Sequence, residues 1–230
     1  MDTFIPTDRT QVRRIPTRGI YDRAEVYSIL DEGYVCHCGF AIDGQPYVIP
    51  TGYARLADEI FIHGSAASRM LRAVGEGIDV CVTVTLLDGL VLARSAFHHS
   101  MNYRSVVILG RARLVSDPVE KFMALRCFTN RIVPDRWEEL RPTTDQELKG
   151  TSVLALRLDE VSAKVRTGGP KDDAEDLDAP VWAGVIPLHT QFGDPVPALD
   201  LASSAPPIDL ARFRRGTQSS SLKLWLSKPV

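Results

Sequence analysis

Residues 47–69 read YVIPTGYARLADEIFIHGSAASR, and this stretch contains the change of pattern that indicates how the chain folds. Two apolar segments rich in strand-forming residues end in a His-Gly pair, and a helical pattern then begins with a Ser-Arg pair. The first turn of a helix presents unpaired backbone N–H groups and the positive end of the helix dipole. Together with the guanidinium of Arg69, this strand-to-helix junction predicts a phosphate site.

The segments before and inside this stretch predict one helix, one hairpin and a second short helix. A helix is expected after Asp22, which forms a capping pair with the Glu three residues later. An apolar run at residues 34–42, the turn signal Asp43-Gly44 and a second apolar run predict a β-hairpin. The next strand should end at His63, and the apolar spacing over residues 67–77 predicts a short amphipathic helix.

The downstream segments predict more strands and one longer helix. Strands are expected over residues 78–87, from Leu90 after a second turn at Asp88-Gly89, from Ser105, and over residues 152–166. A helix starting at Pro118 should bury Phe122, Leu125, Phe128 and Ile132 on one face. Because these strands lack regular helical crossovers, the sequence predicts a mainly β (α+β) fold, an antiparallel barrel with peripheral short helices.

Composition excludes several classes of protein. The chain has 230 residues, 44% of them hydrophobic, and a formal net charge of −2, so it lacks the broad basic surface expected of a nucleic-acid partner. The four cysteines lie in apolar segments without paired CxxC spacing, and they are interpreted as buried thiols: Cys36, Cys38, Cys81 and Cys127. No signal peptide or membrane span is recognisable, and a cytoplasmic location is expected.

Several of these motifs occur together in a known family. The segments VIPTGYA, IHGSAASRM, HHSMNYRSVVILG, SAKVRTGGP and VWAGVIPL resemble the FMN-binding split-barrel proteins related to pyridoxamine 5′-phosphate oxidase, in the branch near the nitroimidazole-resistance proteins. The resemblance implies a six-stranded antiparallel split β-barrel and a homodimer with FMN between the subunits. It divides the chain into an N-terminal arm (residues 1–20), an FMN-binding domain (21–190) and a C-terminal extension (191–230).

The resemblance also assigns a phosphate site. The family places Ser-Arg-Lys at the first turn of the helix after the third strand, and the matching residues here are Ser68, Arg69 and Met70. An apolar residue therefore replaces the usual Lys, so another cation, Arg72 or Arg104, would have to compensate.

The flavin ring is expected on the strand before this junction. The resemblance places main-chain groups of the second barrel strand under the ring, and Gly52 would let a planar ligand approach the backbone closely. A Pro-Gly kink at a barrel corner is the alternative interpretation. The residues concerned are Ile49, Pro50, Thr51, Gly52 and Tyr53, followed at the junction by His63, Gly64 and Ser65.

His63 occupies the position at which the nitroimidazole-resistance branch has a histidine beside the flavin. It is therefore the candidate catalytic residue, because an imidazole there can donate a proton or a hydrogen bond to a substrate. The alternative is a histidine at a strand end that only bonds the backbone.

Three further contacts are expected from HHSMNYRSV. Tyr103, Arg104 and Ser105 are the candidates for flavin or phosphate contacts across the dimer interface, although an ordinary polar strand start is the alternative. His98 and His99 would point to opposite sides of an extended strand, so no metal site is predicted. Trp182 is expected either to cover the pocket or to anchor the interface.

The leading functional hypothesis is an FMN-dependent oxidoreductase that reduces a small organic acceptor with electrons from a nicotinamide or another donor. No G-x-G-x-x-G, G-x-S-x-G or H-E-x-x-H motif suggests a built-in nicotinamide domain or a hydrolase. The C-terminal region also lacks the Arg-x-His substrate motif of a strict pyridoxamine phosphate oxidase. Two alternatives stay open: a flavin-binding protein without turnover, and a split barrel that binds haem or a deazaflavin.

Overall fold

The structure is a computed structural model that describes residues 2–209 and 212. Its strands form one antiparallel sheet in the order β1-β9-β6-β5-β2-β3-β4-β8-β7, with β10 paired to β5 beside this path. The strands are β1 (Gly19–Ile20), β2 (Val35–Ile42), β3 (Gln45–Leu56), β4 (Glu59–Ser65), β5 (Asp79–Leu92), β6 (Ser100–Arg111), β7 (Arg113–Leu114), β8 (Thr151–Arg157), β9 (Glu160–Arg166) and β10 (Gly184–Pro187). The helices are α1 (Arg23–Glu32), α2 (Arg69–Gly75), α3 (Pro118–Ile132) and α4 (Asp145–Gly150).

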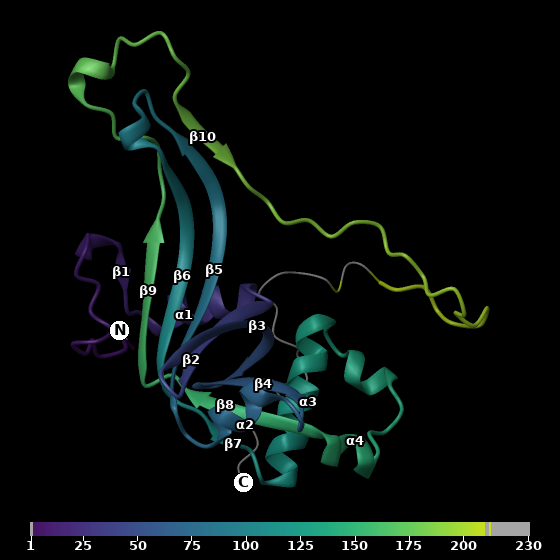
Figure 1. The fold of residues 1–230 in the computed structure, drawn as a ribbon. Coiled ribbons are helices and arrows are strands. Elements are labelled where there is room, and N and C mark those ends of the chain that lie inside the picture. The colour runs from purple at the N-terminus through teal and green to yellow at the C-terminus, as the bar shows by residue number, and fades with distance from the viewer. Residues whose placement is uncertain (1, 210–211, 213–230) are drawn as a thin grey trace.

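The sheet curls into a barrel with peripheral helices, as Figure 1 shows. Alternate side chains of its strands point into one apolar core, for example Cys36 and Cys38 of β2 beside Val82 and Val84 of β5. Helix α1 adds three buried side chains to this core, and α3 covers a second, smaller cluster. The predicted split-barrel architecture is confirmed, with ten strands rather than six.

The split in the barrel is produced by a single strand. Residues 45–52 of β3 pair with β2, whereas residues 53–56 pair with β4. The change of partner falls between Gly52 and Tyr53, so β3 belongs to two sheets in succession. This geometry leaves one edge of its first half without a strand neighbour in the part of the chain that the structure describes.

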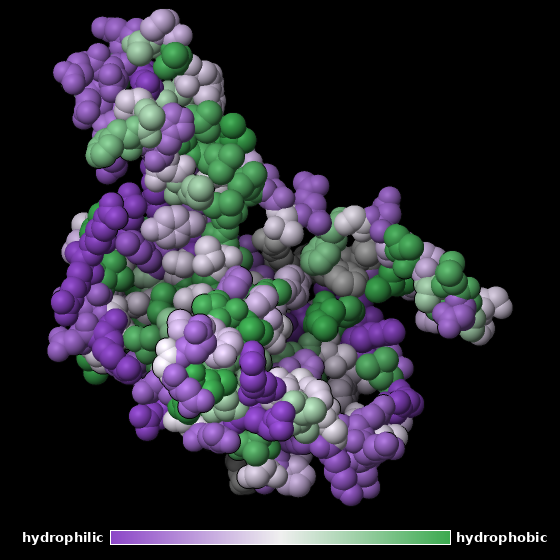
Figure 2. Space-filling model, in the orientation of Figure 1, coloured by the Kyte–Doolittle hydropathy of each residue, from purple (hydrophilic) through white to green (hydrophobic). Residues whose placement is uncertain are grey.

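The β5–β6 hairpin projects well beyond the barrel, and β10 lines its outer edge (Figure 1). A strap over residues 167–183 crosses the hairpin tip, where Asp172 accepts hydrogen bonds from the backbone and side chain of Arg94, at 2.7 Å each. After β10 the chain leaves as an extended arm. Figure 2 shows hydrophobic surface on both the hairpin and this arm, where Leu87, Leu90, Met101, Ile186, Leu188, Val196 and Leu199 are exposed.

The predicted start of the fold is confirmed in detail. Asp22 caps α1 by accepting a hydrogen bond from the Glu25 backbone at 3.0 Å. The Asp43-Gly44 turn joins β2 and β3, and both turn residues have positive φ, 50° and 79°. These values are those of the type I′ turn that favours tight hairpins.

The predicted turn at Asp88-Gly89 is wrong, because β5 runs straight through it. The register with β6 shifts between Leu87 and Gly89, which marks a β-bulge rather than a hairpin turn. The physical reason for glycine here is contact with β10: a Cβ on Gly89 would lie 3.0 Å from the Ile186 carbonyl oxygen. The hairpin turn instead lies farther on, at the short helical turn Ala96–His98.

Three other expectations also need correction. The predicted strand over residues 152–166 is two strands, β8 and β9, because the chain turns at Leu158, whose backbone N–H bonds the Asp58 carbonyl at 2.8 Å. The buried face of α3 contains Phe128, but Phe122 and Ile132 are exposed. Helix α4 was not predicted, although Thr144 and Glu147 form a full capping box there.

The interpretation of the four cysteines as buried thiols holds for three of them, and Cys81 is only half-buried.

Leu222, Leu224 and Leu226 alternate in the sequence as the residues of an additional strand would, and they lie outside the described residues. Among residues 2–209 and 212, no helix combines the length and the apolar character needed to cross a membrane.

Candidate functional site

The candidate site is the split in the barrel, and the region between its two walls is called the cleft below. One wall is the free edge of β3, residues 49–52, and the other is the end of β4 at His63, Gly64 and Ser65. These β4 residues pair with β8 on their far side, so their near side faces β3 without a strand between them. The structure therefore brings together the two segments that the sequence assigned to one ligand.

Arg69 lies at the mouth of this cleft with its guanidinium over an aromatic ring. Its Cζ is 4.7 Å from the centroid of the Tyr47 ring, and Tyr47 in turn stacks on Phe40 at 5.5 Å with an interplanar angle of 19°. Within the described residues, Arg69 has no hydrogen-bond or ion-pair partner. This cation–π contact holds the guanidinium beside the Tyr47 ring, and its N–H groups stay free for an anion.

The helix that begins at Arg69 contributes less to the predicted phosphate site than the sequence suggested. Helix α2 has only seven residues, and the Ser68 hydroxyl caps it by accepting from the Leu71 backbone at 3.4 Å. Met70 packs against the barrel core, and Arg72 donates to the Ala67 carbonyl at 2.9 Å. The guanidinium of Arg69 is thus the cationic group best placed to meet a phosphate at this end of the cleft.

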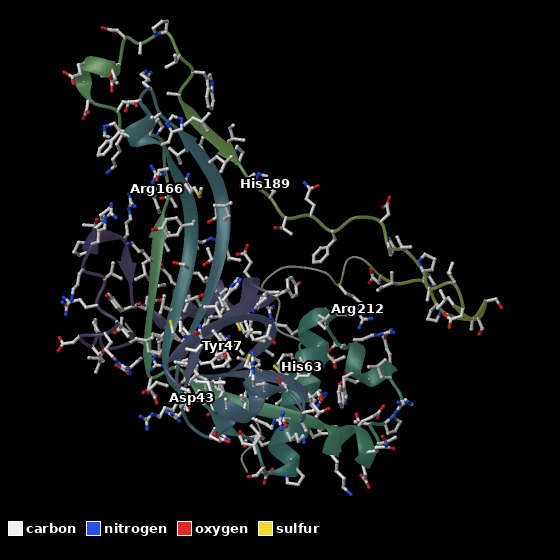
Figure 3. All side chains as sticks on the ribbon, viewed as in Figure 1. Asp43, Tyr47, His63, Arg166, His189 and Arg212 are labelled. Carbon is white, nitrogen blue, oxygen red and sulfur yellow. The ribbon has the colours of Figure 1, made fainter. Side chains whose placement is uncertain are left out.

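His63 lies at the other end of the cleft. Its ring packs edge-on against Phe128 of α3, with centroids 4.1 Å apart. The residue as a whole is exposed, and partial desolvation of the ring by its neighbours lowers its pKa. The last pair of the β3–β4 register is Tyr53 with Ile62, so Gly52 and His63 are the residues that follow this pair on the two strands. A Cβ on Gly52 would have only the Tyr34 carbonyl oxygen within 4.0 Å, so the space above this glycine is open. A neutral imidazole therefore borders an open floor on which a flat ligand can lie. Figure 3 shows Tyr47 and His63 in the barrel, away from Arg166 and His189.

The residues of β3 present alternating groups to the cleft. Pro50 and Gly52 face outward, whereas Ile49 packs against the core. The Tyr53 side chain is buried, and its hydroxyl donates to the Leu30 carbonyl at 2.5 Å. Tyr53 can therefore offer a ligand only its backbone.

The three candidates of β6 lie apart from this cleft within one chain, because β5 and β2 stand between β6 and β3. The Ser105 hydroxyl donates to the Lys164 carbonyl at 3.3 Å, and Tyr103 pairs across the sheet with Arg166. Arg104 points to the opposite side, where its guanidinium bonds Glu32 and Asp88.

Trp182 precedes β10 on the projecting hairpin and is 63% exposed. Its ring lies over Gly184, since a Cβ there would be 2.9 Å from the indole. It is remote from the cleft of its own chain, and its role as a pocket cover or an interface anchor stays a prediction.

Two features of the site were missed from the sequence. The stack of Phe40 on Tyr47 was detectable, because a two-residue turn at residues 43–44 makes these residues cross-strand partners. The buried Arg166 had no local signal; it bonds Asn102 and the carbonyls of Gly168 and Gly169, and so fastens the strap to the hairpin.

The tip histidines have separate partners. The Nε2 of His98 lies 3.0 Å from Asp173, and the Nδ1 of His99 lies 2.9 Å from the Ser95 carbonyl. His98 belongs to the helical turn rather than to an extended strand. Among the described residues, no group of three or more potential ligands is arranged to hold a metal ion.

Comparison with protein families identifies the family to which this fold belongs. The family model described as pyridoxamine 5′-phosphate oxidase matches residues 22–165, which include both walls of the cleft. The chain belongs to the pyridoxamine 5′-phosphate oxidase family. The resemblance seen in the sequence motifs is thus confirmed, and the matched residues include β2, β3, β4 and α2 of this chain.

Two solved members are similar over most of their length. The flavocytochrome Anf3 from Azotobacter vinelandii is 44% identical, with a TM-score of 0.87 over 93% of this chain and 100% of its own. The FAD and heme binding protein from Mycobacterium smegmatis is 39% identical, with a TM-score of 0.80 over 83% of this chain and 94% of its own. Flavin binding is therefore a property of the family to which the chain belongs.

A more distant structure shares the fold. A candidate 5-nitroimidazole antibiotic resistance protein from Bacteroides thetaiotaomicron VPI-5482 is 23% identical, with a TM-score of 0.53 over 64% of this chain and 86% of its own. None of the curated proteins compared with the chain matches it.

Proposed function

We propose that this protein is a flavin-dependent redox protein that holds the flavin in the cleft between β3 and β4. The isoalloxazine ring would meet the free main-chain edge of residues 49–53 beside His63, and the phosphate end would reach Arg69. The observation that carries this proposal is the state of Arg69: its guanidinium lies over the Tyr47 ring, and it has no hydrogen-bond or ion-pair partner among the described residues. Such a group binds an anion with little further ordering.

The charge of the site favours FAD over the FMN expected from the motifs. FMN ends in a phosphate monoester that approaches two negative charges, whereas each phosphate of FAD carries one. FAD therefore spreads the same total charge over two phosphates, and one unpaired Arg beside the apolar Met70 can match the charge of the phosphate that it meets. The similar protein from M. smegmatis is an FAD and heme binding protein, which supports the same choice. Chromatography of the flavin extracted from the purified protein separates the two cofactors.

A haem is the second cofactor that we propose, because both of the similar full-length structures are described as flavocytochrome or heme binding. His37 of β2 fits an iron ligand. Its side chain is exposed on the outer sheet face, has no hydrogen-bond partner among the described residues, and lies opposite Pro50 with exposed Val35 and Val48 nearby. An imidazole on a flat apolar sheet surface can bind the iron of a haem, and the haem would supply one-electron chemistry. Loss of the haem spectrum in His37→Ala, with the flavin retained, tests this assignment.

A homodimer completes the proposal. The projecting hairpin and the arm expose several large apolar side chains, among them Leu87, Ile186 and Val196. Monomeric proteins rarely leave such patches uncovered. A second copy would cover them and would bring its Tyr103, Ser105 and Trp182 towards the flavin of the first. Arg104, held by two carboxylates, would then orient β6 rather than bind the phosphate.

The reaction we propose is electron transfer from a reduced nicotinamide or another donor to a small acceptor. His63 is placed to donate a proton or a hydrogen bond beside the flavin, and its lowered pKa leaves the imidazole neutral at neutral pH. A flavin carrier without turnover is the rival. Adding NADH or NADPH under anaerobic conditions tests the proposal: bleaching of the flavin bands followed by reoxidation with an acceptor supports it, and an unreduced flavin with every donor favours the carrier.

A further inference from the structure

The extended arm after β10 is anchored at both of its described ends, residues 188–209 and Arg212. At its start, the Leu188 backbone N–H donates to a carbonyl at the bulge of β5, at 3.0 Å. At its far end, the Arg212 guanidinium donates to Glu139 at 2.5 Å and to the Pro134 carbonyl, two residues after α3. Figure 3 shows Arg212 beside α3, so the arm runs from the hairpin to this helix.

An aromatic contact between these anchors holds the arm on the barrel. The Phe192 ring meets the Tyr34 ring edge-on, with centroids 6.5 Å apart and an interplanar angle of 80°. The Arg131 guanidinium of α3 lies over the same Tyr34 ring, with its Cζ 5.1 Å from the centroid. The Tyr34 carbonyl oxygen borders the open space at Gly52, at 4.0 Å from a Cβ built there. The arm therefore touches the barrel next to the cleft.

The open space at Gly52 faces α3. Ala54 of β3 and Phe61 of β4 are paired, and both pack in the smaller cluster under α3. Gly52 and His63 lie two residues from them on the same strands, and alternate residues of a strand share a face. The contact of His63 with Phe128 of α3 agrees with this orientation. The arm, which ends at α3, therefore passes the cleft on the side to which its open floor is turned.

The middle of the arm is weakly held. Phe192 is 50% exposed, and every residue from 193 to 204 is exposed. Behind the start of the arm lies a pocket of about 420 Å³, lined by His189 and Thr190 on one side and by Thr85 of β5 on the other. A segment with few buried contacts separates from the protein at a low cost in free energy. The four prolines between residues 195 and 207 restrict the backbone, so the arm moves as a stiff segment.

We infer that the arm gates the cleft and that the contact between Phe192 and Tyr34 is the latch of this gate. While the latch is closed, the arm limits the passage of a flat ligand to Gly52. When Phe192 leaves Tyr34, the path opens, and the arm stays attached through β10 and Arg212. This inference concerns access to the cleft, so it holds for any ligand of the cleft and goes beyond the proposed flavin chemistry.

The test measures how fast a bulky thiol reagent reaches the cleft in the full-length protein without cofactor. Gly52→Cys places a thiol in the open space, and N-(1-pyrenyl)maleimide and the much smaller iodoacetamide report access to it. The rate of the parent protein is subtracted, because Cys81 is half-buried. In this background Phe192→Ala should raise the pyrenylmaleimide rate about 5-fold, since an edge-on aromatic pair stabilises the closed arm by about this factor. The iodoacetamide rate should stay nearly unchanged, because this reagent is small enough to pass the closed arm.

Two variants and a second thiol position are the controls. Phe192→Tyr keeps the ring and should react as the background protein does. Leu199→Ala shortens a fully exposed side chain of the same arm and should also leave the rate unchanged. Ser65→Cys, at the end of β4 on the opposite wall, repeats the measurement if Gly52→Cys does not fold. In the flavin-loaded protein, Phe192→Ala should speed flavin release by the same factor.

The outcomes separate the gate from the proposed function. A faster pyrenylmaleimide reaction in Phe192→Ala alone, with unchanged thermal unfolding, supports the gate. An unchanged rate overturns it. An equal increase with both reagents overturns it too, because that result would show a general loosening of the fold. A parent protein that binds no flavin overturns the proposed function, and the thiol rates still decide the gate.

Discussion

Arg104 of β6 and Glu32 at the end of α1 are joined by two hydrogen bonds, of 2.5 and 3.0 Å. The same guanidinium donates twice to Asp88, at 3.0 and 2.7 Å, so two carboxylates occupy its Nε, Nη1 and Nη2 atoms. These bonds hold the pKa of Arg104 above its usual value. Arg104 ties α1 to the bulge of β5, at the point where the hairpin leaves the barrel.

Arg104→Ala should therefore lower stability rather than cofactor affinity. Two carboxylates would face each other without the cation, and we expect the free energy of unfolding to fall by about 1 to 2 kcal/mol, a value reduced for partial exposure. Urea denaturation measures this change. Arg157→Ala, which removes an exposed guanidinium paired with Asp159, is the matched control and should change stability much less. Weaker flavin binding at unchanged stability would instead show that Arg104 contacts the cofactor.

Gly52→Val should block the cleft without harming the fold. The new side chain enters open space, because only the Tyr34 carbonyl lies within 4.0 Å of a Cβ there. We expect unfolding to change by less than about 1 kcal/mol, while flavin affinity falls at least about 10-fold through steric overlap. Retention of the flavin by this variant would place the ring elsewhere.

Gly89→Ala should detach β10 from the hairpin. The added methyl group would meet the Ile186 carbonyl and the Val185 side chain, both at 3.0 Å, and we expect a loss of about 1 to 3 kcal/mol. Faster hydrogen exchange of the β10 amides would report it. Gly150→Ala is the matched control, since no atom lies within 4 Å of a Cβ there. Equal exchange in both variants would contradict the role given to Gly89.

His63 should make the free energy of unfolding depend on pH below neutral pH. Burial lowers its folded-state pKa below the reference value of 6.5, so the unfolded chain binds a proton that the folded chain does not. Stability is then complete above pH 6.5 and declines as the pH falls below it. Both His63→Phe and His63→Asn should flatten this part of the curve in thermal unfolding. A curve that stays unchanged in both variants would show that another group titrates there.

Local patterns were sufficient for much of the barrel. The Asp43-Gly44 turn fixed the β2–β3 hairpin and its register, and the capping residue Asp22 fixed the start of α1. The resemblance then grouped the residues of β3 and of the end of β4 into one site, and the structure places these segments on neighbouring strands. The assignments of cofactor contacts to these residues stay predictions.

Features set by distant neighbours could not be read from local sequence. Asp88-Gly89 has the composition of a turn, yet β10, almost 100 residues later, lies against the glycine and makes it a bulge. The partners of Arg104 are likewise 72 and 16 residues away, so its sequence context looked the same as that of a phosphate ligand. In both places tertiary contact overrides the local signal.

The change of partner of β3 at Gly52 has a mechanical consequence. Because one continuous strand belongs to both sheets, a movement of the two halves of the barrel relative to each other bends this strand at the cleft. A ligand that bridges the free edge of β3 and the end of β4 would resist that bending. The cofactor would then link β3 and β4 where they are not paired by backbone hydrogen bonds. Its removal should let the two sheets loosen independently of each other.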